Sequence, residues 1–159
     1  MKDNKHRSVN TKFWERSYII SLNPVEKLLF LYLLTNPITN LAGIYEISMR
    51  RIEFDTGIDK GLVIKTIEKF QKDNKLLYHE GFIILLNFYR DQSYNSSMKT
   101  NVRNIIEGLP EKIKKFVLEL SDESIKQLLT SCKQPVQKLT TLGGEDLVRR
   151  ILLSENKRK

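Results

Sequence analysis

The sequence has a single cysteine, Cys132, and only two histidines, His6 and His79, among its 159 residues. One cysteine cannot form an intramolecular disulfide. The two histidines lie far from each other and from Cys132 in the chain, so the ligand spacing of a zinc site is absent. The sequence also lacks a glycine-rich phosphate loop and an HExxH motif, and neither histidine has a neighbouring nucleophile. We therefore expect no metal, no cofactor and no enzymatic activity.

Long apolar runs are missing as well. No run reaches the ~18 apolar residues that a membrane span needs. The polar and basic residues 1–12 contain no apolar signal core. We therefore expect no membrane partner and a cytoplasmic location. Hydrophobic residues still make up 40% of the chain, which is enough for a packed core.

The chain does carry an excess of positive charge, +8 at pH 7. A basic balance favours an anionic partner such as nucleic acid, and a merely soluble basic protein is the alternative. The charge is unevenly spread, because residues 23–92 carry as many acids as bases and the surplus lies in the flanking segments. This distribution favours a local basic patch assisted by basic arms over a purely electrostatic clamp.

The stretch 48–86 has the order helix, turn, helix, hairpin. Helices are predicted over 49–56 and 60–74, because a serine and an aspartate stand where the first turns need an N-cap, and a glycine closes the first helix. Two short apolar runs, 75–79 and 82–86, are separated by a Glu-Gly pair and predict a two-stranded hairpin. This order is typical of a winged helix-turn-helix, whose second helix reads DNA.

The segments before this stretch predict an anchor, a buried helix and a strand. Trp14 lies among other apolar residues, so we expect it to pack in the core, the alternative being stacking on a base. Asn23, Pro24 and Glu26 fit the N-cap, the first turn and the capping box of a helix that runs to about residue 35. Leucines cover most sides of this helix, so we expect it to be buried centrally. Residues 42–47 predict a short strand that joins the hairpin.

Amphipathic patterns after the hairpin predict helices near 98–107, 111–120, 123–132 and 145–154. These helices either dock on the core or offer their apolar stripes to a partner. The predicted fold is mainly α with a small β-sheet (α+β), a winged helix-turn-helix followed by C-terminal helices. Its expected parts are a flexible basic arm over 1–12, a DNA-binding domain over 13–110, and a partly flexible helical extension over 111–159.

The second helix of the motif, 60–74, has an apolar back and a largely basic front. The back repeats at i, i+3, i+4 and i+7 with Val63, Thr66, Ile67 and Phe70. The front combines Gly61, Lys65, Glu68, Lys69 and Lys72. A recognition helix needs both faces, and an ordinary solvated lysine face is the alternative.

The expected DNA contacts follow from this helix and its neighbours. Lys65 and Lys69 would face the groove, and Lys72 would lie nearer the DNA backbone. Lys60 and Gly61 lie at the helix start, the end that commonly meets base edges. Arg50 and Arg51 would hold phosphates and fix the register, and Lys75 and His79 would hold the flanking strand, a plain exposed residue of the hairpin being the alternative for His79. The full set of expected DNA-binding residues is Arg50, Arg51, Lys60, Gly61, Lys65, Lys69, Lys72, Lys75 and His79.

Between about residues 10 and 110 the chain resembles the N-terminal domain of phage replisome organisers, which are replication initiation proteins of Gram-positive phages and prophages. The resemblance is carried by Lys12-Phe13-Trp14, by the run LLFLYLLTNP from Leu28 to Pro37, by Gly43-Ile44-Tyr45-Glu46-Ile47, by Phe54-Asp55-Thr56-Gly57, by Lys69-Phe70 and Tyr78, and by Asn87-Phe88 with Gln92-Ser93. It implies a winged-helix module that binds origin DNA.

Longer members of that family continue into a domain that engages the replicative helicase or its loader. The present chain shows no clear copy of such a domain, so the helicase side and self-association both stay open as partners. We therefore expect a replication initiator that binds double-stranded origin DNA and is associated with the nucleoid. A winged-helix transcriptional regulator, or a protein-interaction module without DNA binding, is the alternative, because fold does not determine function.

Overall fold

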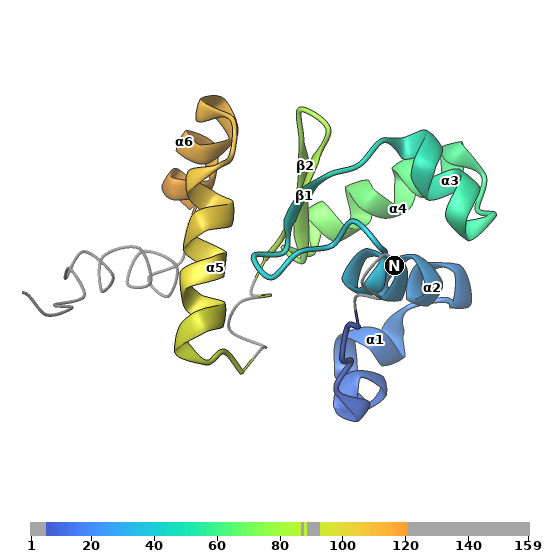
Figure 1. Ribbon diagram of the computed structural model, residues 1–159. Helices are drawn as coiled ribbons and strands as arrows, with labels where there is room; N and C mark the ends of the chain where they lie inside the picture. The colour runs from blue at the N-terminus through green and yellow to red at the C-terminus, as the bar shows by residue number, and fades with distance from the viewer. Residues whose placement is uncertain (1–5, 87, 89–92, 121–159) are drawn as a thin grey trace, which may run out of the picture.

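The computed structural model describes residues 6–86, 88 and 93–120. This part of the chain is mostly helical and contains a three-stranded antiparallel sheet (Figure 1). The α+β class predicted from the sequence is thereby confirmed. The helices predicted over 123–132 and 145–154 lie outside the described residues.

The order of elements follows the predicted order closely. The elements are the 3₁₀ helix η1 (Thr11–Glu15), α1 (Ser17–Ser21), α2 (Pro24–Thr35), β1 (Ile44–Glu46), α3 (Met49–Thr56), α4 (Lys60–Lys72), β2 (Leu76–His79), β3 (Phe82–Leu85), α5 (Ser96–Glu107) and α6 (Glu111–Leu120). The helix, turn, helix and hairpin expected over 48–86 are all present. The predicted third strand is also present and pairs with the hairpin as β1.

Local side-chain chemistry accounts for the starts of the helices. At α2 the Asn23 side chain accepts a hydrogen bond from the Glu26 amide at 2.9 Å, and the Glu26 carboxylate accepts one from the Asn23 amide at 3.0 Å. This reciprocal pair is the capping box expected from the sequence. Ser48 caps α3 by accepting from the Arg51 amide, and Asp59 caps α4 in the same manner. The three helix starts are therefore determined within four residues of chain.

The sheet has the strand order β1-β3-β2, and its two faces enter two different apolar clusters. In β3, Ile83 and Leu85 belong to the cluster with α1–α4, whereas the intervening Ile84 belongs to the cluster with α5 and α6. Ile44 and Tyr45 of β1 divide between the clusters in the same way. This two-residue alternation follows from strand geometry and makes the sheet a middle layer.

The first cluster lies between the sheet and the helices α1–α4. Its fully buried side chains are Leu29, Leu33, Ile52, Val63, Phe70, Leu76 and Ile83. Leu29 and Leu33 place one side of α2 at the centre of this cluster, but Leu28 is half-exposed. The expectation that α2 is buried on most sides is therefore wrong for this side, because no other element of the described chain covers it.

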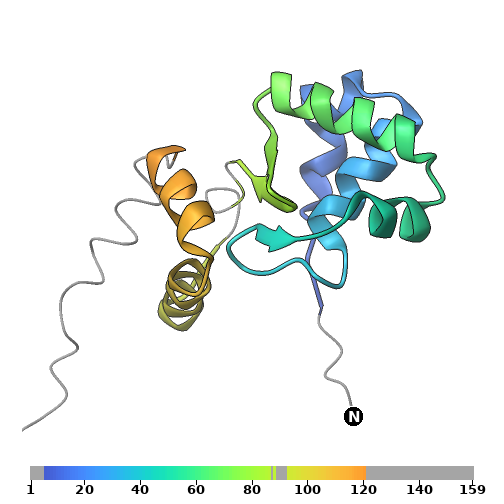
Figure 2. The same cartoon turned by 90° about the horizontal axis from the view of Figure 1, so that it is seen from above.

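The second cluster holds α5 and α6 against the other face of the sheet. It contains Val102 and Ile106 of α5 and Ile113 and Val117 of α6, packed with Ala42, Ile44 and Ile84. Figures 1 and 2 show these two helices on one side of the hairpin and α1–α4 on the other. The sequence left open whether the C-terminal helices dock on the core, and the two that the structure describes do so.

Trp14 is 54% exposed, so the expectation that it packs in the core is wrong. Its neighbour Phe13 is buried instead, with its ring centroid 6.3 Å from that of Phe30. Adjacent side chains of a 3₁₀ helix point about 120° apart, since the helix has three residues per turn. Only one of the two rings can therefore face the core, and Trp14 packs on Phe13 in a T-shaped arrangement with the ring centroids 5.0 Å apart.

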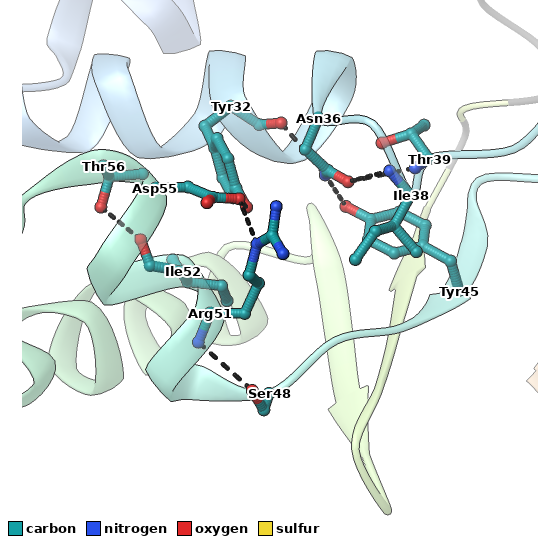
Figure 3. Close-up of polar contacts among 10 residues, drawn as sticks. All are labelled: Tyr32, Asn36, Ile38, Thr39, Tyr45, Ser48, Arg51, Ile52, Asp55 and Thr56. Carbon is teal, nitrogen blue, oxygen red and sulfur yellow. Dashed lines mark hydrogen bonds and ion pairs between the residues drawn. The ribbon is translucent and has the colours of Figure 1, made fainter. Parts of the chain in front are cut away.

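A buried polar group connects the end of α2 to β1 (Figure 3). The Tyr45 hydroxyl donates to the Leu33 carbonyl at 2.6 Å and accepts from the Asn36 side-chain amide at 2.9 Å. The Asn36 side-chain oxygen in turn accepts from the Thr39 amide at 3.0 Å. Burial raises the pKa of Tyr45 to about 12, so the hydroxyl stays a donor. These bonds fix the turn that leads from α2 into the sheet.

Candidate nucleic-acid interface

The helix α4 has the two faces that its sequence predicts. Val63, Thr66, Ile67 and Phe70 are all buried in the first cluster or beside it. The opposite side is open to solvent and presents Gly61, Lys65, Glu68 and Lys72. A turn of three residues separates α4 from α3, and these two helices pack directly against each other. We call the solvent-exposed residues Lys60, Gly61, Lys65, Glu68 and Lys72 the α4 face.

Three lysines give the α4 face its charge. Lys60, Lys65 and Lys72 are exposed, and within the described residues none of their ammonium groups pairs with a carboxylate. Glu68 is the acidic residue of this face and is also exposed. Its own side chains therefore sum to a charge of plus two, and the carboxylates of Asp59 and Glu53 lie at its start, where they accept from the Gly61 and Lys60 amides.

Lys69 lies at the edge of the α4 face and is bound to α2. Its ammonium group lies 2.8 Å from each carboxylate oxygen of Glu26. The Lys69 side chain is 43% exposed and that of Glu26 only 12%. Burial would raise the pKa of Glu26, but hydrogen bonds from Lys69 and from the Asn23 amide, together with the Lys69 charge, lower it below its usual value. The structure therefore places Lys69 in an intramolecular contact between α2 and α4.

Arg51 of α3 is also engaged within the protein (Figure 3). Its Nε lies 2.7 Å from an Asp55 carboxylate oxygen, which also accepts from the Tyr32 hydroxyl at 2.6 Å. These two hydrogen bonds lower the pKa of Asp55, and the bond and charge of Asp55 raise the pKa of Arg51. Arg50 is exposed and has no such partner in the described part of the chain.

Phe54 lies one helical turn after Arg50 and is 83% exposed. It is a surface residue of the interface region that the sequence reasoning missed as a candidate. The signal was present, because Ile52 is a core position and a residue two places later lies about 200° around the helix. A large exposed ring one helical turn from an exposed arginine is a candidate contact for a partner surface.

The two residues expected to act from the hairpin are both turned toward the body of the protein. The Lys75 ammonium lies over the Tyr18 ring at 4.4 Å from its centroid. The His79 ring stacks on Phe116 of α6 with centroids 4.2 Å apart and an interplanar angle of 18°. The hairpin turn between the strands is formed by Glu80 and Gly81, both with positive φ.

The described part of the predicted basic arm, residues 6–12, lies against the body. The Arg7 guanidinium donates to the Thr39 carbonyl at 2.6 Å, and Asn10 caps η1 by accepting from the Lys12 amide. Five of the predicted DNA-binding residues are thus exposed to solvent, namely Arg50, Lys60, Gly61, Lys65 and Lys72. The structure engages Arg51, Lys69, Lys75 and His79 in contacts within the chain.

No protein-family model, curated protein or solved structure matches the chain. Among the residues that the structure describes, no group of three or more His, Cys, Asp or Glu side chains is placed to hold a metal ion. In the same residues no helix has both the length and the apolar character needed to cross a membrane. The evidence for a function of this site therefore consists of its geometry and its charge.

Proposed function

We propose that this chain binds duplex DNA with α4 in the major groove and serves as the origin-binding module of a phage or mobile-element replication initiator. The observation that carries the proposal is the α4 face, which is basic, free of intramolecular pairing within the described residues and supported from behind by the core. The α3–α4 pair with its three-residue turn and the hairpin that follows supports the assignment of a winged helix-turn-helix.

The dimensions and polarity of α4 suit this role. An α-helix with its side chains is about 10–12 Å across, and the major groove of B-DNA is about 12 Å wide. Residues near the start of a recognition helix commonly reach base edges, and Lys60, Gly61 and Lys65 lie within the first two turns of α4. Lys72 lies at the other end, where we infer a contact to a phosphate. Arg50 on α3 is a further exposed cation of the helix-turn-helix.

The replication role is supported by the resemblance to phage replisome organisers rather than by the α4 face. A winged helix serves transcriptional regulators and protein-interaction modules as well, so the geometry alone favours DNA binding without choosing the biological process. Origin binding and promoter binding differ in where the protein sits on the parent genetic element. Footprinting on that element distinguishes the two, since origin repeats support the initiator and a promoter site supports the regulator.

The test of DNA binding compares single lysine variants in salt-titrated fluorescence anisotropy. Lys65→Ala removes a groove-facing cation and should weaken binding to the cognate duplex by roughly tenfold, with less effect on an unrelated duplex. Lys72→Ala should weaken binding to both duplexes alike and lower the salt slope by about 1. Lys99→Ala is the matched control, because Lys99 is an exposed lysine of α5 on the other side of the sheet.

Lys69 is a poor choice for this test, since its replacement also breaks the contact with Glu26. The proposal is wrong if the full chain binds no duplex even at low salt. It is also wrong in its assignment of α4 if Lys65→Ala and Lys72→Ala bind as Lys99→Ala does.

A further inference from the structure

The hairpin of this protein carries no cation of its own at its tip. Residues 76–85 contain no lysine or arginine, and Glu80 in the turn is acidic. Lys75 at the base of the hairpin points to Tyr18. A phosphate beside this turn would meet a negative charge unless another element supplied a positive one.

That element is α6. The His79 ring, directly before the turn, stacks on Phe116, and the Lys112 ammonium lies 3.9 Å from a Glu80 carboxylate oxygen. Ile113 and Val117 fix α6 in the second cluster, so its position beside the hairpin is part of the packed fold. Figure 2 shows α6 on one side of the hairpin and α4 on the other.

The lysines of α6 differ in how available they are. Lys112 has a side chain that is 82% exposed, and Lys115, one helical turn later on the same side, is also exposed. Lys114 has only 29% of its side chain exposed and lies 3.5 Å from Glu111. Lys112 therefore projects into solvent beside the hairpin turn and Lys115 does so one helical turn farther along α6, whereas Lys114 is held against its own helix.

We propose that Lys112 and Lys115 of α6 bind the sugar–phosphate backbone of duplex DNA beside the hairpin turn, and so supply the phosphate contacts that the hairpin itself lacks. This inference rests on the proposed function, because the DNA bound is the duplex whose major groove α4 enters. The Lys112 ammonium near Glu80 also lessens the repulsion between the turn and the phosphates. The contacts are to the backbone, so they add affinity without sequence preference.

The test measures the salt dependence of duplex binding by the full chain, using fluorescence anisotropy with the cognate duplex and an unrelated one. Each phosphate contact contributes about 0.9 to the slope of log affinity against log salt concentration. Lys112→Gln and Lys115→Gln should therefore each lower the slope by about 1 and weaken binding to both duplexes equally. Lys114→Gln removes the same charge from the same helix and should leave the slope unchanged. Thermal denaturation should show that all three variants fold as the parent does.

Three results would overturn the inference. If Lys65→Ala weakens binding while Lys112→Gln and Lys115→Gln bind as the parent does, α6 makes no phosphate contact and the proposed function stands. If Lys114→Gln lowers the slope as much as the other two variants, net charge and not position explains the effect. If the parent chain binds no duplex at low salt, the proposed function fails and this inference fails with it.

Discussion

The contact between Lys69 and Glu26 should stabilise the fold by coupling α4 to the first turn of α2. The Lys69 ammonium is within 2.8 Å of both Glu26 oxygens, and these residues are 43 positions apart in the chain. A charge-assisted hydrogen bond contributes roughly 1.5–3 kcal/mol, and an exposed ion pair contributes 1 kcal/mol at most. Glu26 is largely buried, but Lys69 is 43% exposed and solvent screens its charge. We therefore place the coupling free energy at the upper limit for an exposed ion pair, at about 1 kcal/mol.

A double-mutant cycle measures this coupling. The variants are Glu26→Gln, Lys69→Met and the combination of the two, each compared with the parent in urea denaturation. Glutamine keeps a side-chain oxygen that can still accept from the Asn23 amide, so the capping box is largely preserved and the cycle reports the pair. We expect each single variant to lose about 1 kcal/mol and the double variant to lose little more. For a chain of 159 residues that loss lowers Tm by roughly 3 °C.

The pH dependence provides an independent check with a definite sign. The pKa of Glu26 in the folded protein lies below its ordinary value of 4.5, so its ionised form stabilises the fold above that pH. The difference between the parent and Glu26→Gln should be constant above about pH 5 and should shrink as the pH falls through the folded-state pKa. A coupling energy indistinguishable from zero, or a difference that grows in acid, would refute the reasoning.

Two further predictions concern stability and use urea denaturation. Gly43→Ala should destabilise the fold by about 2–4 kcal/mol, because φ is +68° and a Cβ would lie 2.7 Å from the Phe88 ring. Gly57→Ala should cost only about 1 kcal/mol, because φ is similar at +69° but a Cβ there would enter open space. Equal losses would contradict the steric argument. Tyr45→Phe should cost about 1–2 kcal/mol, because it removes the bonds that the hydroxyl makes with Asn36 and Leu33; a loss below about 0.5 kcal/mol would show that those groups find other partners.

The elements that were predicted correctly are those specified by short stretches of chain. Asn23 and Glu26 bond to each other across three residues, so their types and spacing are enough to locate the start of α2. The apolar back of α4 follows from helical periodicity alone, and the hairpin follows from two apolar runs around Glu80 and Gly81. In each case the residues that determine the element lie within the element itself or next to it in the sequence.

The assignments that failed or changed depend on residues distant in sequence. Trp14 lies among apolar neighbours, but the geometry of η1 and the position of Phe30 decide that Phe13 faces the core instead. Lys69 belongs to a basic pattern along α4, and only the packing of α2 against α4 shows that Glu26 binds it. No periodicity within α4 can reveal which of its lysines is held by another helix.

The same packing resolves an apparent conflict between charge and function. Residues 23–92 have equal numbers of acids and bases, and taken alone this balance weakens the case for DNA binding. Most acidic side chains of this segment accept hydrogen bonds or form ion pairs within the protein. Glu26 binds Lys69, Asp55 binds Arg51, Asp73 accepts from Tyr18, Asp59 caps α4, Glu53 accepts from the Lys60 amide and Glu80 lies near Lys112.

Several basic side chains of the segment, unlike most of the acidic ones, make no such contact in the described chain. Arg50, Lys60, Lys65 and Lys72 stay open to solvent. Glu68 opposes them within the α4 face, and the carboxylates of Asp59 and Glu53 lie at its start beside Gly61 and Lys60. A phosphate responds to the charges near it, since salt at physiological strength screens exposed charges beyond about 8 Å. A segment that is neutral in sum therefore still offers Lys65 and Lys72 to a phosphate farther along α4, beyond the carboxylates at its start, and its net charge alone does not count against the proposed function.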